Sequence, residues 1–129
     1  MMRKLDSILL IDDDEIGVYV AQIILDECDA AFHVEIAKNG KEAISYIENC
    51  EGAYPSLMFL DTNMPIMGGN EFMNWYIHSE YNHKIKIVLC SGCIRQEEMD
   101  MMTSNPDIIS CLEKPITKDK LHNILNEYF

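Results

Sequence analysis

Four short apolar runs, each leading to an acidic, hydroxyl or basic side chain, limit the possible folds of this chain more than any other feature. The runs and the residues that follow them are residues 8–11 before Asp12, 57–60 before Asp61, 85–90 before Ser91, and 108–112 before Lys114. Short apolar runs bounded by turn signals are typical of buried strands in a parallel sheet, and such sheets bind ligands at the carboxyl ends of their strands. The pattern therefore predicts one sheet edge that gathers three or four carboxylates, a hydroxyl and a lysine.

Helical spacing of apolar residues fills the segments between these runs. It predicts helices over residues 15–30, 41–49, 69–79 and 95–102, a last helix after an N-cap at Thr117, and another strand over residues 34–37. The positions of the first helix expected to face the core are Val20, Ala21, Ile24 and Cys28. This alternation predicts an α/β fold, a three-layer, doubly wound (βα)5 arrangement with a parallel five-stranded sheet.

Length and charge narrow the functional classes. The 129 residues suit one domain with one hydrophobic core, so we expect a single domain over residues 1–129 with no output domain. Against 10 Lys and Arg stand 22 Asp and Glu, which gives a formal net charge of -12. Such a charge opposes attraction to phosphate backbones and anionic lipid, so neither nucleic acid nor a membrane is an expected direct partner.

The chain start and the cysteines predict a cytoplasmic location. The apolar run after the first residues is shorter than a secretory signal requires, and no run approaches the length of a membrane span. Five cysteines, an odd number scattered through predicted strands and helices, fit a reducing compartment better than a disulfide framework.

The predicted sheet edge has the chemistry of phosphoryl transfer. Asp12 and Asp13 after the first strand, with Asp61 after the third, offer the hard oxygen ligands that Mg²⁺ prefers. With a cation beside it, Asp61 can stay ionised and attack phosphorus as a carboxylate nucleophile. Lys114 and the Ser91 hydroxyl are placed to neutralise the phosphoryl oxygens.

At these spacings the motifs resemble the receiver domain of two-component response regulators, the CheY-like superfamily. The segments that carry the resemblance are residues 11–14 (IDDD), 60–67 (LDTNMPIM), 90–92 (CSG) and 113–115 (EKP). The resemblance implies a flavodoxin-like fold with strand order 2-1-3-4-5. It also implies that a phosphohistidine on a sensor histidine kinase or histidine phosphotransfer protein donates the phosphoryl group. No separate substrate turnover, and hence no enzyme in the ordinary sense, is expected.

The same resemblance implies a role for each motif residue. Asp61 is the phosphoacceptor, and Mg²⁺ or Mn²⁺ is held by Asp12, Asp13, Asp61 and the backbone carbonyl of Asn63. Ser91, followed by Gly92, closes onto the phosphoryl group, Lys114 pairs with it, and the peptide before Pro115 is cis. Phosphorylation would then signal by conformational change to an unknown protein target, or by homodimerisation.

Two positions depart from the family pattern. Cys111 stands where the family often has an aromatic residue that swings inward, so an aromatic rotamer switch is not expected here. Gly68 replaces a common acidic residue of the turn after the third strand, which we interpret as loop variation.

Other functions are compatible with parts of the sequence. Residues 12–16 (DDDEI) resemble the D-x-D-x-[TV] motif of haloacid-dehalogenase-type phosphatases, which would make Asp12 the nucleophile. A non-phosphorylated pseudo-receiver that acts only by protein contact is a second alternative. Cys90 and Cys93 form a C-x-x-C that could be a redox pair, although Cys90 is expected to point into the core. Excess apolar residues on the first helix suggest a docking patch for the phosphodonor: Ile16, Val18, Tyr19 and Ile23.

Overall fold

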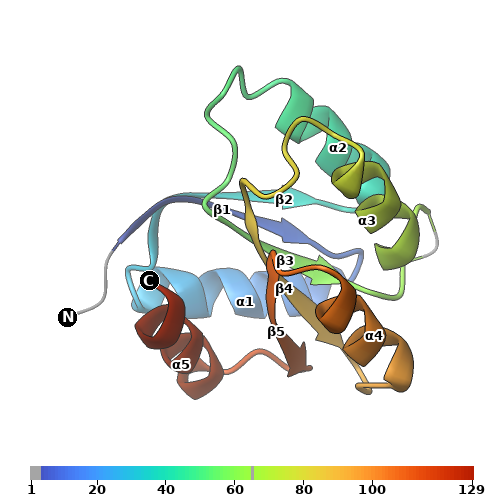
Figure 1. Ribbon diagram of the computed structural model, residues 1–129. Coiled ribbons are helices and arrows are strands. Elements are labelled where there is room, and N and C mark those ends of the chain that lie inside the picture. The colour runs from blue at the N-terminus through green and yellow to red at the C-terminus, as the bar shows by residue number, and fades with distance from the viewer. Residues whose placement is uncertain (1–3, 65) are drawn as a thin grey trace.

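A single parallel sheet with helices on both faces forms the molecule (Figure 1). The computed structural model describes residues 4–64 and 66–129, so Pro65 of the 60–67 motif lies outside the described residues. In chain order the elements are β1 (Leu5–Ile11), α1 (Glu15–Glu27), β2 (Ala31–Ala37), α2 (Gly40–Glu48), β3 (Leu57–Asp61), α3 (Gly69–Ile77), β4 (Lys86–Ser91), α4 (Gln96–Ser104), β5 (Ile108–Glu113) and α5 (Lys118–Tyr128). The strand order is β2-β1-β3-β4-β5, which confirms the predicted fold class.

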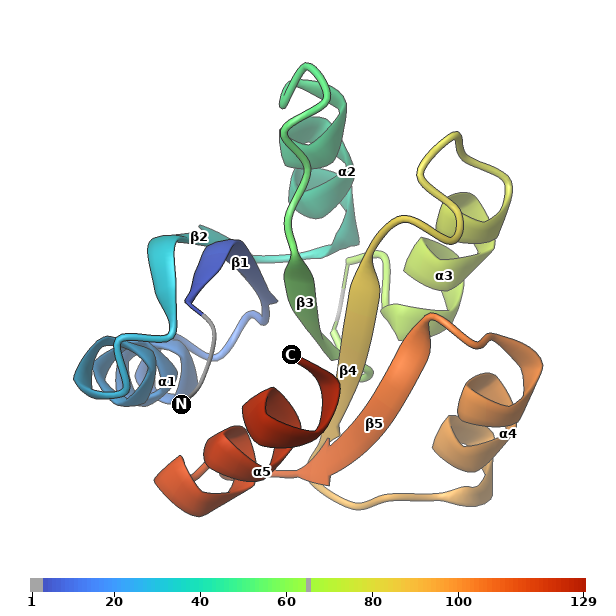
Figure 2. The same cartoon turned by 60° about the vertical axis from the view of Figure 1, so that its left-hand side comes forward.

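Two hydrophobic clusters, one on each face of the sheet, hold the layers together. Along β1, Leu9 and Ile11 belong to the cluster beneath α2 and α3, whereas Ile8 and Leu10 belong to the cluster beneath α1 and α5. Figure 2 shows these helix pairs on opposite sides of the strands. Strands covered on both faces are apolar at every position, because successive side chains point to opposite faces. This is why the inner strands β1, β3 and β4 contain the apolar runs 8–11, 57–60 and 87–90.

The structure extends two strands beyond their predicted starts and shortens two helices, of which α3 ends at Ile77 rather than at residue 79. Both β1 and β2 begin three residues earlier than expected, because Leu5 pairs with Ala31 in parallel register. Helix α1 ends at Glu27 rather than at residue 30, and Asp29 adopts a left-handed backbone with φ 49°. A left-handed residue terminates a helix, so the chain turns there into β2.

The predicted core face of α1 was partly wrong. The buried residues of α1 are Val18, Ala21 and Leu25, at spacings of three and four. Val18, which the sequence pattern places on the excess apolar surface, is therefore a core residue, whereas the predicted core residue Val20 is 42% exposed. Because α1 is apolar over more than half of its circumference, periodicity alone did not determine which stripe meets the sheet.

The last helix forms as predicted. The Thr117 side chain accepts a hydrogen bond from the backbone N–H of Lys120, which satisfies one of the unpaired donors of the first turn. Leu121, Ile124 and Leu125 are buried against the sheet.

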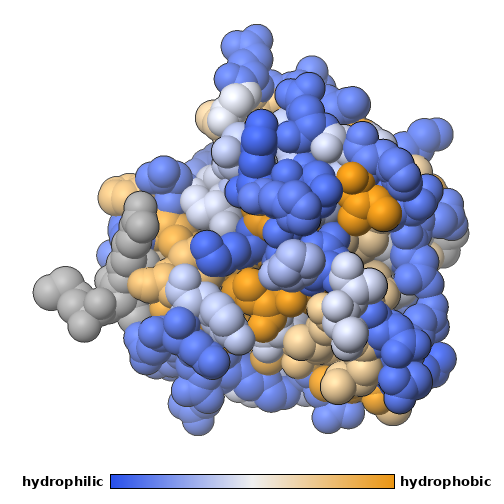
Figure 3. Space-filling model, viewed as in Figure 1, coloured by the Kyte–Doolittle hydropathy of each residue, from blue (hydrophilic) through white to orange (hydrophobic). Residues whose placement is uncertain are grey.

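The surface is mainly hydrophilic on the face shown in Figure 3, as the acidic composition predicts. The formal net charge is -12, and the hydrophobic residues of this face form a few separate groups. Among the described residues, no helix combines the length and the apolar character needed to cross a membrane.

A buried tyrosine ties α3 to the amino end of β5. The Tyr76 hydroxyl lies 2.6 Å from Asp107 Oδ2 and 3.2 Å from both the backbone oxygen and the backbone nitrogen of Ile85. Asp107 also accepts a hydrogen bond from the backbone N–H of His83 at 2.6 Å. Burial, followed by the hydrogen bond to Asp107, raises the pKa of Tyr76, so the phenol stays neutral and donates.

We expect Tyr76→Phe to lower the free energy of unfolding by about 1–3 kcal/mol, because the Asp107 side chain, only 12% exposed, loses a donor that water does not readily replace. Urea denaturation followed by circular dichroism measures the change. Tyr19→Phe, at a position 65% exposed, is the matched control and should change little. Equal effects of the two substitutions would contradict the role assigned to the buried hydroxyl.

Candidate functional site

Three carboxylates meet at the carboxyl edge of the sheet, as the sequence predicts. β1 and β3 are parallel neighbours with Ile11 opposite Leu60, so Asp12 and Asp61 follow at the same level. Asp12, Asp13 and Asp61 each offer an oxygen, and these oxygens all lie within 4.8 Å of one another. A set of hard oxygen donors at this spacing is chemically suited to a divalent cation such as Mg²⁺.

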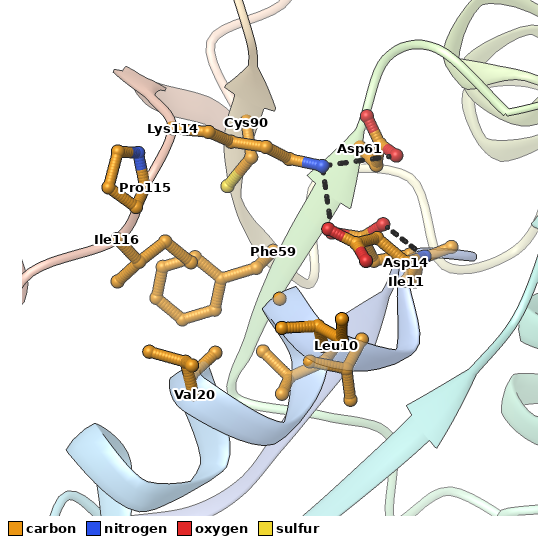
Figure 4. A pocket seen from close by; sticks show the side chains of 15 residues that line it. Leu10, Ile11, Asp14, Val20, Phe59, Asp61, Cys90, Lys114, Pro115 and Ile116 are labelled. Atoms are coloured by element: carbon orange, nitrogen blue, oxygen red, sulfur yellow. Dashed lines mark hydrogen bonds and ion pairs between the residues drawn. The ribbon is translucent and has the colours of Figure 1, made fainter.

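A lysine from the end of β5 closes the cluster. Lys114 Nζ lies 2.9 Å from Asp12 Oδ2 and 3.3 Å from Asp61 Oδ2 (Figure 4). Its backbone N–H donates to the Ser91 carbonyl at 2.7 Å, and the Lys114–Pro115 peptide is cis, as predicted. The lysine thus reaches the two aspartates from a backbone position set by β4.

The electrostatics of the cluster make ionised Asp61 costly. The Asp61 side chain is 6% exposed. Burial and, to a smaller extent, the charge of Asp12 raise its pKa, the Asn63 N–H and Lys114 counteract part of the shift, and the resulting pKa is about 6. Burial lowers the pKa of Lys114, but the hydrogen bond and charge of Asp12 and the charge of Asp61 outweigh burial, so its pKa is raised. The site therefore keeps its lysine charged and favours an additional positive charge beside Asp61.

Asn63 orients the buried carboxylate through its backbone. The Asn63 N–H donates to Asp61 Oδ1 at 3.1 Å, while Oδ2 of the same carboxylate faces Lys114. The two oxygens of Asp61 therefore have different partners. The proposed contact of the Asn63 carbonyl with a metal ion stays a prediction.

Ser91 ends β4 beside this cluster and is engaged with the following segment. Its hydroxyl proton is shared between two acceptors, the Cys93 carbonyl at 2.7 Å and Glu98 Oε1 at 3.0 Å from Oγ, and the Cys93 N–H donates to Oγ at 3.3 Å. The space around Gly92 is open, since an added Cβ would meet no atom within 4 Å. A larger side chain would therefore fit at position 92 without a clash.

Glu98 is a polar residue of this region that the sequence analysis did not single out. It lies in the first turn of α4 and is only 4% exposed. The one available signal was its position as the fourth residue of Arg95-Gln96-Glu97-Glu98, where an acidic side chain can bond back to the N-cap. The N-cap is an arginine rather than Ser or Thr, so the signal was weak.

The cysteines do not form a redox pair in the structure. Cys90 is buried, as expected, while Cys93 is exposed, and all five cysteines are free. Burial raises the pKa of Cys90, so its thiol resists the ionisation that redox chemistry requires. Cys111 is half-buried on β5. Because it replaces the aromatic residue common in the family, this position has no ring that could rotate inward.

A cavity of about 360 Å³ opens between α1 and the segment after β5. Figure 4 shows that one end holds Lys114 and Asp61, while Phe59, Val20 and Ile116 line an apolar part. Two exposed apolar residues of α1, Ile16 and Val20, line this cavity, whereas the exposed Tyr19 and Ile23 line a separate cavity beside β2. The charged cluster is therefore bordered by an accessible hydrophobic surface.

Comparison with known proteins identifies the class. The model of the response regulator receiver domain family matches residues 8–126, so the chain belongs to this family. It is 28% identical over 128 residues to the two-component response regulator ORR41 of Oryza sativa subsp. japonica, covering 99% of this chain and 98% of the relative. It is 27% identical over 127 residues to the two-component response regulator ARR22 of Arabidopsis thaliana, covering 98% and 86% respectively.

Solved structures agree with this assignment. A two component response regulator from Cytophaga hutchinsonii superposes with a TM-score of 0.88 at 26% identity, covering 97% of each chain. The bacteriophytochrome response regulator AtBRR shares the fold with a TM-score of 0.78 at 23% identity. The receiver assignment is favoured over both the haloacid-dehalogenase-type phosphatase and the pseudo-receiver alternatives.

We expect Asp61→Asn to stabilise the metal-free protein at pH 7.5 by about 1–2 kcal/mol, a few degrees in Tm, because it removes a buried charge that the site disfavours. The Asp61 pKa is raised to about 6 in the folded chain. Ionised Asp61 therefore opposes folding above that pH, and its protonation relieves the cost as the pH falls. Thermal unfolding in EDTA at pH 7.5 and pH 5 should show the difference shrinking at the lower pH.

Asp14→Asn is the matched control, because Asp14 is exposed and its side chain makes no capping hydrogen bond. It should leave Tm nearly unchanged at both pH values. A loss of stability in Asp61→Asn at pH 7.5 would contradict the assigned electrostatics.

Proposed function

We propose that this chain is a phosphorylatable switch in which Asp61 accepts a phosphoryl group from a phosphohistidine in a Mg²⁺-dependent reaction. The observation that carries the proposal is the buried Asp61 carboxylate at the end of β3, set between two further aspartates and within 3.3 Å of Lys114 Nζ. Phosphoryl transfer requires mainly positioning and charge neutralisation, and these residues supply both. Membership of the receiver family supports the same reaction.

The transfer step follows from the two oxygens of Asp61. Oδ1 is held by the Asn63 N–H, and Oδ2 lies beside Lys114. A carboxylate oxygen attacks phosphorus, an O–P bond forms, and the N–P bond of the phosphohistidine breaks. The imidazole leaves with the bonding electron pair and takes a proton from solvent. The products are an aspartyl phosphate and a free histidine on the donor.

Charge neutralisation is divided between a metal and the lysine. Asp12, Asp13, Asp61 and the backbone carbonyl of Asn63 would hold Mg²⁺ or Mn²⁺, which when bound neutralises the phosphoryl oxygens. Lys114, now paired with two carboxylates, would turn one N–H to a phosphoryl oxygen. Ser91 would donate its hydroxyl proton to another. The downstream signal would pass by protein contact, including contact with a second copy of this chain.

The exposed face of α1 is proposed as the docking surface for the phosphodonor protein. Ile16 is 77% exposed and Tyr19 is 65% exposed, which is unusual for large apolar side chains in one patch. Ile16 also lines the cavity that leads to Lys114 and Asp61. A helix of a histidine kinase or histidine phosphotransfer protein that packs there would bring its phosphohistidine to the carboxylate cluster.

The central test is intact-mass spectrometry after incubation with Mg²⁺ and acetyl phosphate. We expect a phosphoryl adduct on the wild type, its loss in EDTA, and its loss in Asp61→Ala. Asp14→Ala, which changes an exposed acid just outside the cluster, is the control and should retain the adduct. An adduct that survives Asp61→Ala but disappears in Asp12→Ala would instead support the phosphatase-type nucleophile.

The docking surface has its own test, with any histidine phosphotransfer protein that phosphorylates the wild type as donor. Ile16→Glu should slow transfer from that protein at least about tenfold, because a buried charge replaces an apolar contact. It should leave labelling by acetyl phosphate unchanged. Ile77→Glu, on α3 and 43% exposed, is the matched control and should transfer normally. Equal transfer by Ile16→Glu and the wild type would refute this surface.

A further inference from the structure

Helix α4 is attached to the rest of the molecule in an unusual way. Its only buried residue is Glu98, which is 4% exposed, whereas residues 92–97 just before it are all exposed. Met101 and Met102 are only partly buried against the neighbouring cluster. In α1 and α5 the buried residues are apolar, and each helix has three. The first turn of α4 is therefore held by a polar side chain rather than by a hydrophobic face.

The partners of Glu98 show what holds it. Glu98 Oε1 accepts a hydrogen bond from the Ser91 hydroxyl at 3.0 Å and a longer one from the Arg95 N–H at 3.4 Å. A buried carboxylate is costly unless donors satisfy it, so the shorter bond from Ser91 is the main compensation. The charge of Glu98 also contributes, after burial, to the raised pKa of Cys111, which places the carboxylate near β5.

The Ser91 hydroxyl has one proton to donate. Within the described residues two acceptors share it, the Cys93 carbonyl at 2.7 Å and Glu98 Oε1 at 3.0 Å, so the hydroxyl is committed to α4 and the preceding segment. A phosphoryl oxygen on Asp61 would compete for that same proton. When the hydroxyl turns to the phosphoryl group, Glu98 keeps only the long contact with Arg95 while it is still buried.

We propose that Glu98 is a positioning residue that links the Ser91 hydroxyl to α4, so that phosphorylation of Asp61 breaks the Ser91–Glu98 hydrogen bond and releases the first turn of α4. This inference rests on the proposed function, because it requires a phosphoryl group on Asp61. Once unpaired, the carboxylate regains hydration by moving outward. The exposed residues 92–97 offer little packing resistance to that movement. The contact between one hydroxyl and one carboxylate thereby couples the reaction site to a helix.

The test is hydrogen exchange of the α4 amides, residues 96–104, with phosphorylation measured by intact mass in the same samples. In the unphosphorylated protein, Ser91→Ala and Glu98→Ala should each raise α4 exchange roughly tenfold, and the double variant should exchange no faster than Glu98→Ala. Acetyl phosphate with Mg²⁺ should raise α4 exchange in the wild type by a similar factor. Glu98→Ala should still be phosphorylated, to an equal or higher level, without a further increase.

Ser91→Ala separates this coupling from simple helix capping, because it leaves the contact between Glu98 and the Arg95 N–H in place. Glu97→Ala is the matched control: it removes the neighbouring glutamate, which pairs with Asn70, and should still respond to phosphorylation as the wild type does. The proposal is overturned if Ser91→Ala leaves α4 exchange unchanged, or if the phosphorylated wild type shows no increase. Absence of an adduct on Asp61 would refute the proposed function and with it the release of α4. The α4 exchange of the unphosphorylated variants would still show whether the Ser91–Glu98 hydrogen bond holds α4 in place.

Discussion

The ion pairs of Lys114 with Asp12 and Asp61 are the interaction on which the site depends. Three carboxylates within 4.8 Å of one another repel, and a single lysine offsets only part of that repulsion. Their placement follows from the parallel sheet, which brings the ends of β1, β3 and β5 to one edge. The resulting deficit of positive charge is what makes the site receptive to a divalent cation.

The molecule combines a rigid sheet with one helix, α4, whose one buried residue is polar. Strands β1, β3 and β4 are covered on both faces, so the side chains at their ends have closely defined positions. Helix α4 instead packs Met101 and Met102 only partly against the core and buries Glu98, which lies within hydrogen-bond distance of the Ser91 hydroxyl. A chemical event at the rigid edge can therefore change the attachment of α4 without disturbing the core that holds Asp61 in place.

Sequence patterns predicted the parts of the structure that depend on local order. Apolar runs identified the strands, Thr117 marked the start of α5, and the strand ends located Asp12, Asp61, Ser91 and Lys114 at one edge. The buried stripe of α1 was partly misassigned, since Val18 faces the core and Val20 does not. Apolar residues surround most of that helix, so only contact with the sheet selects the face that is buried.

The sequence by itself determined the class of fold and the family, and it supplied the candidate residues of the site, because periodicity, turn residues and motif spacing are properties of the chain order. Only the tertiary structure decided the burial of Glu98, its bond to Ser91 and the raised pKa of Asp61. These depend on distances between segments far apart in the chain and on the exclusion of water from their side chains. Glu97 and Glu98 are neighbouring glutamates in the sequence, but Glu97 is exposed and Glu98 is buried. Only the packing of α4 against β4 and β5 makes this difference.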